Sequence, residues 1–134
     1  MSHAAGPFDV KVTPQATFFD TDTTRVGRMS IDKQYHGDLE GTGLGEMLTG
    51  GTDVKGSGVY VAIERVTGNL QGRRGSFLLQ HGGTMVRGAP HLSITVVPDS
   101  GTDELVGLTG EMGIAIAADG KHSYDFKYTL PKGP

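Results

Sequence analysis

The chain has no cysteine. This absence excludes a disulfide framework, a thiolate zinc site, an iron–sulfur cluster and a cysteine nucleophile. Positive charge is also scarce, because 12 lysines and arginines stand against 15 aspartates and glutamates and leave a net charge of -3. Nucleic-acid binding needs clustered cations, and the chain offers only the doublet Arg73 and Arg74. We therefore expect no nucleic-acid partner and no polybasic membrane-binding surface.

Long apolar runs are missing as well. Runs such as residues 113–118 are far shorter than the roughly 18 residues that a membrane-spanning helix needs. The first seven residues have neither the basic nor the apolar region of a signal peptide, so we expect a cytoplasmic protein. The 5 histidines are not spaced as metal ligands, and no nucleotide-binding fingerprint is present. We expect neither a metal nor a cofactor.

Glycine, in contrast, is abundant, with 22 residues in a chain of 134. These glycines follow no strict three-residue period, which excludes collagen, and β-branched and aromatic residues stand between them. Only residues 13–26 offer a weak helical signal. The length suits one domain, which we expect over residues 8–131, with residues 1–7 and 132–134 as flexible termini.

The pattern predicts about eight β-strands and an all-β fold. Turn residues mark joints at 67–69, 81–83, 98–101 and 119–120, and glycines also lie inside several strands, as at Gly41, Gly43 and Gly45. Internal glycines let strands bend, which favours a closed antiparallel barrel over the rival two-sheet sandwich. The expected strands cover residues 8–13, 27–36, 37–48, 56–67, 74–81, 91–97, 104–117 and 123–130.

Alternation within these strands predicts which side chains point inward. Tyr60, Ala62 and Glu64 share one face of their strand. The apolar content of the next strand places Phe77, Leu79 and His81 beside them, whereas a shift of one residue would bring in Gln80. The last strand carries an apolar face made of Tyr124, Phe126 and Tyr128.

A carboxylate inside such a barrel has two interpretations. An eight-stranded barrel can hold side chains or one small ligand, and burial would raise the pKa of Glu64 and make it a proton acceptor near neutral pH. Tyr60 or His81 would then be its hydrogen-bond partner. Alternatively, Glu64 lies near the rim or pairs with Arg73 or Arg74.

Five separated blocks of sequence resemble a known family. The blocks cover residues 60–68, 72–81, 96–102, 105–110 and 121–124. They contain, in this order, the stretches Tyr60-Val61-Ala62-Ile63-Glu64-Arg65, Gly72-Arg73-Arg74-Gly75-Ser76-Phe77, Val96-Val97-Pro98-Asp99-Ser100-Gly101-Thr102, Leu105-Val106-Gly107 and Lys121-His122-Ser123-Tyr124. The chain resembles a bacterial family called domain of unknown function 3224 from about Phe8 to Leu130. The resemblance departs at Asp103, where the family pattern has glycine.

The resemblance implies an eight-stranded antiparallel closed barrel that is allene oxide cyclase-like or lipocalin-like. Relatives with this fold bind apolar small molecules and form dimers or trimers, so the resemblance implies a homodimer or homotrimer here. It implies no established activity.

Three functions follow as hypotheses. The favoured one is binding of an apolar or aromatic small molecule inside the barrel, against Phe77, Leu79, Gln80, Tyr124, Phe126 and Tyr128. The second is an isomerase or cyclase in which Glu64 accepts a proton, assisted by Tyr60 and His81. The third is a structural or oligomerisation role with a filled barrel, since fold does not fix function.

Overall fold

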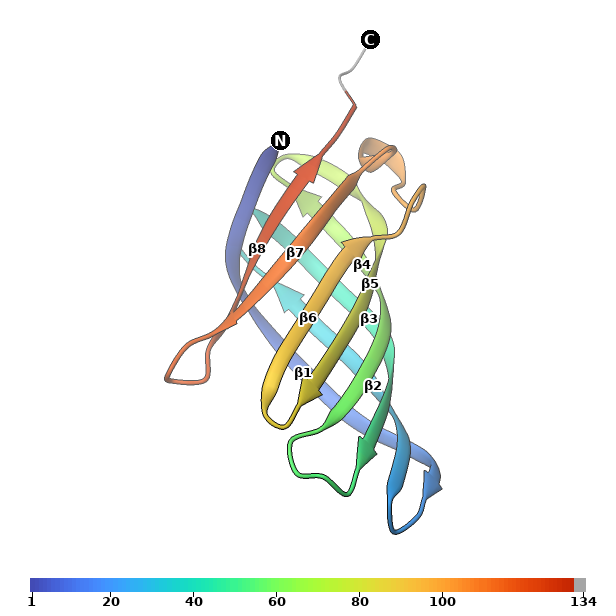
Figure 1. The fold of residues 1–134 in the computed structure, drawn as a ribbon. Helices are drawn as coiled ribbons and strands as arrows, with labels where there is room; N and C mark the ends of the chain where they lie inside the picture. Colours follow the sequence, from blue (N-terminus) through green and yellow to red (C-terminus); the bar gives the residue numbers. More distant parts are fainter. Residues whose placement is uncertain (132–134) are drawn as a thin grey trace.

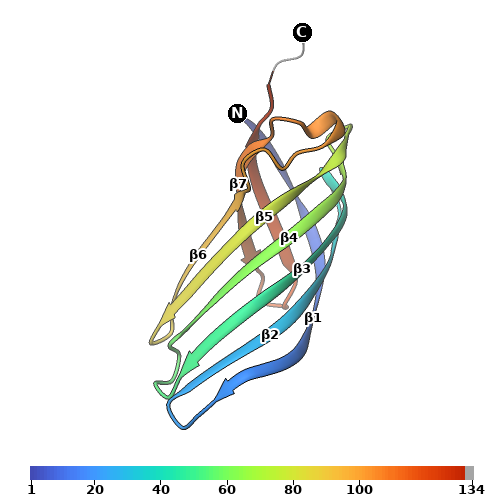
Figure 2. The same ribbon diagram turned by 90° about the vertical axis from the view of Figure 1, so that its right-hand side faces the viewer.

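Eight antiparallel strands close into a barrel in the computed structural model of the chain (Figures 1 and 2). Each strand pairs with the next one along the chain, and β8 pairs with β1. The predicted closed barrel is confirmed. The structure describes residues 1–131, apart from the side chains of residues 16–18. The strands are β1 (Ser2–Asp20), β2 (Thr24–Tyr35), β3 (Leu39–Thr52), β4 (Gly58–Leu70), β5 (Arg73–Val86), β6 (Ala89–Val96), β7 (Thr109–Ile116) and β8 (His122–Thr129).

The side chains alternate between the interior and the solvent. In β8, Tyr124, Phe126 and Tyr128 are buried while the residues between them are exposed. In β2 the buried side chains are Ile31, Lys33 and Tyr35. This period of two is what a barrel wall requires, since one face of each strand meets the core and the other meets water.

The first strand differs from the expectation at both of its ends. Ser2 to Phe8 pair with β8, so residues 2–7 belong to the barrel wall and are not a flexible terminus. The physical reason is closure: β8 needs a partner for its backbone hydrogen bonds, and the start of β1 provides it. At its other end β1 continues to Asp20, through the region with the weak helical signal. Residues 132–134 lie outside the described residues.

Two hairpin turns come later in the chain than the glycine pattern predicts. β4 runs through Gly68 and turns at Gln71 and Gly72, whose φ angles are 48° and 93°. β5 runs through its paired glycines and turns at Arg87 and Gly88, with φ angles of 48° and 92°. Positive φ at both central residues gives the twist that two-residue hairpins prefer. The expected joints at 67–69 and 81–83 are therefore strand.

One end of the barrel is closed by the segment that joins β6 to β7. A short 3-10 helix, η1 (Asp103–Leu105), lies where a strand from residue 104 was expected. Leu105 and Leu108 are buried, and below them Phe77 and Phe126 stack with ring centroids 5.8 Å apart. This closed end is a filled core.

The opposite end of the barrel is open. β7 and β8 have 8 residues each, whereas β1 to β5 have 12 to 19 and extend well beyond them (Figure 1). The inner face of the longer strands is therefore uncovered at this end. Among the described residues, no helix has the length and apolarity that crossing a membrane requires.

Candidate functional site

A cluster of polar side chains is buried halfway along the barrel. The carboxylate of Glu64 has no solvent exposure, and Lys33 and His81 are each 4% exposed. Oε1 of Glu64 accepts hydrogen bonds from Nζ of Lys33 at 3.0 Å and from Nε2 of His81 at 2.8 Å. Oε2 accepts one from the hydroxyl of Tyr35 at 2.5 Å. We call these four residues the Glu64 cluster.

Neighbouring strands bring Glu64 and His81 together. Glu64 of β4 pairs with Leu79 of β5, and Ala62 pairs with His81, so the two functional side chains are diagonal neighbours on the inner face. The predicted inner faces of these two strands are confirmed, and the alternative shift of one residue, which would bring in Gln80, does not occur. Tyr60 lies on the same inner face, opposite Gly83.

Lys33 and Tyr35 reach Glu64 from β2, across β3. On β3, Gly43 pairs with both Lys33 and Val66, and Gly45 pairs with Glu64. A Cβ atom at residue 43 would overlap Oε2 of Glu64. The carboxylate of Glu64 therefore occupies the space that a side chain at residue 43 would fill.

Lys33 and Tyr35 were not among the site residues predicted from the sequence. Arg73 and Arg74, the suggested partners for Glu64, are exposed at the start of β5, and a lysine takes that role instead. A signal for this lysine was available, because it stands between Ile31 and Tyr35 on one face of a strand. A lysine flanked in this way is either snorkelling or paired with a buried acid.

The cluster lowers the pKa of Glu64, whereas we expected burial to raise it. Burial by itself does raise this pKa, but the hydrogen bond from His81, the charge of Lys33 and the hydrogen bond from Tyr35 together outweigh it. Glu64 is therefore ionised at neutral pH and already accepts three hydrogen bonds. This finding corrects its predicted role, because a carboxylate held in this way is a poor proton acceptor.

The ionised carboxylate also assigns the tautomer of His81. A carboxylate only accepts hydrogen bonds, so Nε2 of His81 must carry a hydrogen, and in the neutral ring Nδ1 keeps a free lone pair. None of the hydrogen bonds in the described part of the chain uses this Nδ1.

Burial, and to a smaller extent the charge of Glu64, raises the pKa of Tyr35, which keeps its hydroxyl a neutral donor. The same two causes raise the pKa of Tyr60.

A cavity of about 210 Å³ lies on the open side of the Glu64 cluster. Lys33 and His81 line it, but Glu64 does not. Its other walls include Phe8, Val10, Ile31, Tyr60, Ile114 and His122. The cavity shares Met47, Tyr60 and Leu92 with an apolar groove of about 470 Å³ at the open end of the barrel. Nitrogen atoms at the inner end of an apolar space can orient a bound molecule.

Most of the predicted ligand-binding residues lie elsewhere. Phe77, Leu79, Tyr124, Phe126 and Tyr128 are buried in the filled half of the barrel and do not line the cavity. The alternation of side chains along a strand distinguishes the inner face from the outer one but does not give the height of a residue along the barrel axis.

Gln80, the remaining predicted ligand residue, is exposed on the outer face opposite Ile63. It therefore does not belong to the interior set.

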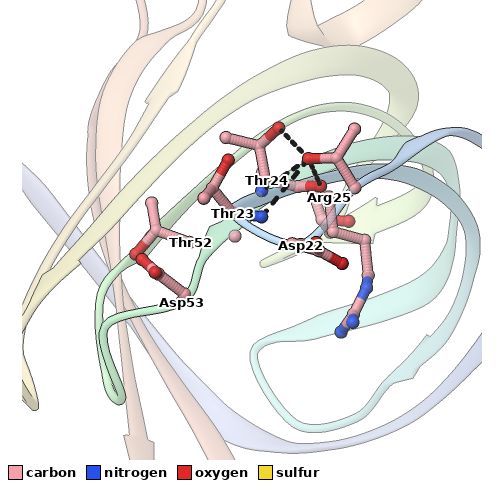
Figure 3. A pocket seen from close by; sticks show the side chains of 10 residues that line it. Asp22, Thr23, Thr24, Arg25, Thr52 and Asp53 are labelled. Atoms are coloured by element: carbon pink, nitrogen blue, oxygen red, sulfur yellow. Dashed lines mark hydrogen bonds between the residues drawn. The ribbon is translucent and has the colours of Figure 1, made fainter.

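A second pocket lies outside the barrel interior, at the tips of the β1–β2 and β3–β4 hairpins (Figure 3). Asp22, Thr23, Arg25 and Asp53 are among its lining residues, and all four are exposed. Within residues 1–131, no three histidine or acidic side chains are grouped so that they could hold a metal ion. The buried cluster and its cavity are therefore the stronger candidate site.

The fold and the site define a small antiparallel barrel that is filled at one end and hollow at the other, with an ionic cluster between the two halves. The chain belongs to the family described as protein of unknown function (DUF3224), whose sequence model matches residues 4–128. A crystal structure of a protein with unknown function from this family, from Shewanella oneidensis MR-1, is 46% identical. The match covers 98% of this chain and 99% of that one, with a TM-score of 0.92. A comparison with curated proteins finds no match.

Proposed function

We propose that this protein binds an apolar or aromatic small molecule in the hollow half of its barrel. The observation that carries the proposal is the cavity of about 210 Å³, which has apolar walls and the nitrogen atoms of Lys33 and His81 at its inner end. Burial of apolar ligand surface would supply the affinity, and the polar end would fix the orientation of the ligand.

The size of the cavity limits the ligand. Pockets for drug-sized molecules usually measure about 300–1,000 Å³. The cavity is smaller, so the part of the ligand inside the barrel is a single ring or a short chain. A larger molecule would extend into the adjoining groove past Tyr60 and Leu92.

The hollow half also argues against a filled barrel with a purely structural role. A barrel built only for stability would fill both halves with side chains, because empty apolar space costs free energy. Here the aromatic side chains fill one half, and the other half keeps a cavity beside a buried charge pair. The homodimer or homotrimer and the cytoplasmic location stay predictions.

Binding can be tested with N-phenyl-1-naphthylamine, a neutral apolar dye whose fluorescence rises when it leaves water. We expect the wild-type protein to enhance the dye's fluorescence in a saturable way. Ile31→Trp fills the cavity and should abolish the enhancement, because Ile31 is a buried lining residue. Ile63→Trp makes the same change on the outer face, where Ile63 is 58% exposed, and should bind the dye as the wild type does.

Two results would contradict the proposal. One is a wild-type protein that gives no saturable enhancement. The other is an Ile31→Trp variant that is folded by circular dichroism and still binds the dye with unchanged affinity, since the dye would then lie outside the cavity.

A further inference from the structure

We propose that His81 is a general base, which removes a proton from the carbon next to the carbonyl group of a small apolar molecule in the cavity while Lys33 stabilises the resulting oxyanion. This inference rests on the proposed function, because it needs a ligand in the same cavity. The proton acceptor is then the imidazole of His81 and not the neighbouring carboxylate of Glu64, which the sequence suggested.

The geometry around His81 is that of a supported base. Nε2 donates to the ionised carboxylate of Glu64 at 2.8 Å, which leaves the lone pair of Nδ1 free. His81 is 4% exposed and lines the cavity, so a molecule there contacts a ring that is itself almost fully buried. When Nδ1 takes up a proton, the imidazolium stays hydrogen-bonded to a negative charge. A carboxylate behind a histidine supports the base in this way in other enzymes.

Lys33 supplies the complementary charge. Its Nζ and Nε2 of His81 both bond to Oε1 of Glu64, so the two nitrogen-bearing groups lie side by side at the inner end of the cavity. An ammonium group has three N–H donors, and Lys33 uses two of them, toward Glu64 at 3.0 Å and toward the hydroxyl of Tyr35 at 3.4 Å. The third can donate to a carbonyl oxygen and stabilise the negative charge that develops there.

The reaction needs no further reactant. A C–H bond next to the carbonyl breaks, its proton goes to Nδ1 of His81, and its electron pair forms the C–C double bond of an enolate. The enolate oxygen accepts a hydrogen bond from Lys33. Return of the proton from His81 to the same carbon, or to a conjugated one, restores the carbonyl. The outcome is isomerisation when a conjugated carbon takes the proton, or hydrogen exchange when a proton from water first replaces the one on Nδ1, with no change of oxidation state.

Other titratable groups surround this base. The charged or titratable side chains on its side of the barrel are Glu64 and Tyr60 from β4, Lys33 and Tyr35 from β2, and His122 from β8. The facing residues from β1, β6 and β7 are apolar, namely Phe8, Leu92 and Ile114. With neutral histidines, Lys33 and Glu64 cancel in charge, so protonation of His81 leaves one net positive charge, which the negative charge of the enolate balances.

The proton-abstraction step can be tested with 5-nitro-1,2-benzisoxazole, a small aromatic probe for a buried base. A base removes the proton on C3, the N–O bond breaks, and the electron pair leaves on oxygen, giving the coloured 2-cyano-4-nitrophenolate. We expect the wild-type protein to accelerate this elimination above the buffer rate. His81→Gln should lower kcat/KM by about 100-fold, within the usual contribution of a general base.

Matched variants isolate each group. His36→Gln removes a histidine on the far side of the Glu64 cluster, whose Nε2 lies 3.4 Å from Asp9, and should react as the wild type does. Lys33→Met should lower kcat more than it raises KM, because Lys33 acts on charge that develops in the transition state. Lys11→Met removes an exposed lysine of β1 and should leave both constants unchanged.

The positioning role of Glu64 has its own readout in the split between kcat and KM. Glu64→Gln keeps the size of the side chain but removes the negative charge that stabilises the imidazolium formed during the reaction, so kcat should fall while KM stays close to the wild-type value. A purely structural role for Glu64 would change the shape of the cavity and raise KM as well.

The outcomes separate this inference from the binding proposal. If the naphthylamine dye does not bind, both fail. If the dye binds and the benzisoxazole displaces it, but elimination is no faster than in buffer or is unchanged in folded His81→Gln, only the general base is overturned. If His81→Gln does not fold, the wild-type pH profile decides: a plateau supports the base, and a rate that stays proportional to hydroxide overturns it.

Discussion

Gly43 shows how much a single residue contributes to this site. It is buried on the inner face of β3, between Lys33 on one neighbouring strand and Val66 on the other. Because it has no side chain, the carboxylate of Glu64 occupies its place and meets donors from a strand that is not its neighbour. The buried ion pair thus depends on a glycine that makes no polar contact of its own.

We predict that Gly43→Ala destabilises the protein by about 2–3 kcal/mol, as overpacking and displacement of a buried group do. The added methyl group overlaps Oε2 of Glu64, which cannot move without loosening its bond to Tyr35. Urea unfolding followed by circular dichroism would measure the loss.

Gly51→Ala is the matched control in the same strand, because a Cβ there has nothing within 4 Å, and it should change stability by less than about 0.5 kcal/mol. Equal stability of the two variants would contradict the role assigned to Gly43.

Among the structural elements, η1 contains Asp103, where the resemblance to the family led us to expect glycine. Asp103 begins this short helix with a φ of 53°, in the left-handed region. Glycine adopts this conformation without strain, whereas in an L-residue the close approach of Cβ to the following carbonyl oxygen costs free energy. Aspartate tolerates the region better than most residues, so the helix still forms.

We therefore predict that Asp103→Gly raises the free energy of unfolding by about 0.5 kcal/mol, because relief of the left-handed strain exceeds the added freedom of the unfolded chain. Asp103→Ala keeps the Cβ and should not stabilise. Thermal unfolding of the three proteins at one pH would compare them. A lower melting temperature for Asp103→Gly than for Asp103→Ala would contradict this explanation.

At the scale of the whole molecule, the barrel divides into a filled half and a hollow half. The segment from β6 to β7 covers one end with Leu105 and Leu108, while the short β7 and β8 leave the other end open. The Glu64 cluster lies between the two halves, so the carboxylate of Glu64 is shielded from water while Lys33 and His81 border the cavity. Ionic groups in such a position couple the stability of the barrel to pH.

We predict that stability falls in acid because of Glu64. Its pKa is lowered in the folded state, so the unfolded chain takes up the proton first as pH falls. The contribution of Glu64 is present in full above its ordinary pKa of about 4.3 and is lost as pH drops from there toward the folded value. Melting temperatures between pH 7 and pH 3 would follow the loss.

Glu64→Gln provides the comparison. It should be less stable at pH 7, because Lys33 is then buried without its counter-charge, but its stability should depend less on pH between 5 and 3. Glu46→Gln removes an exposed carboxylate, 4.0 Å from Arg28, and should keep the wild-type slope. Parallel pH curves for the wild type and Glu64→Gln would show that another group carries the acid sensitivity.

The sequence by itself determined the all-β barrel, the family and the inner faces of β4 and β5. These features depend on periods and turns within one strand or between consecutive strands, where alternation leaves few choices. The sequence alone therefore predicted that Glu64 and His81 lie close together. The sequence did not predict the turns at Gln71 and Arg87, because the first left-handed position of each turn holds neither asparagine nor aspartate.

Only the tertiary structure decided what Glu64 does. Lys33 and Tyr35 come from a strand one removed, and their reach depends on barrel curvature and on the empty space at Gly43. These contacts reversed the direction of the pKa shift that burial alone would cause. The height of each side chain along the barrel, which separates the filled core from the cavity, also follows from strand stagger around the closed ring. Local sequence patterns do not encode that stagger.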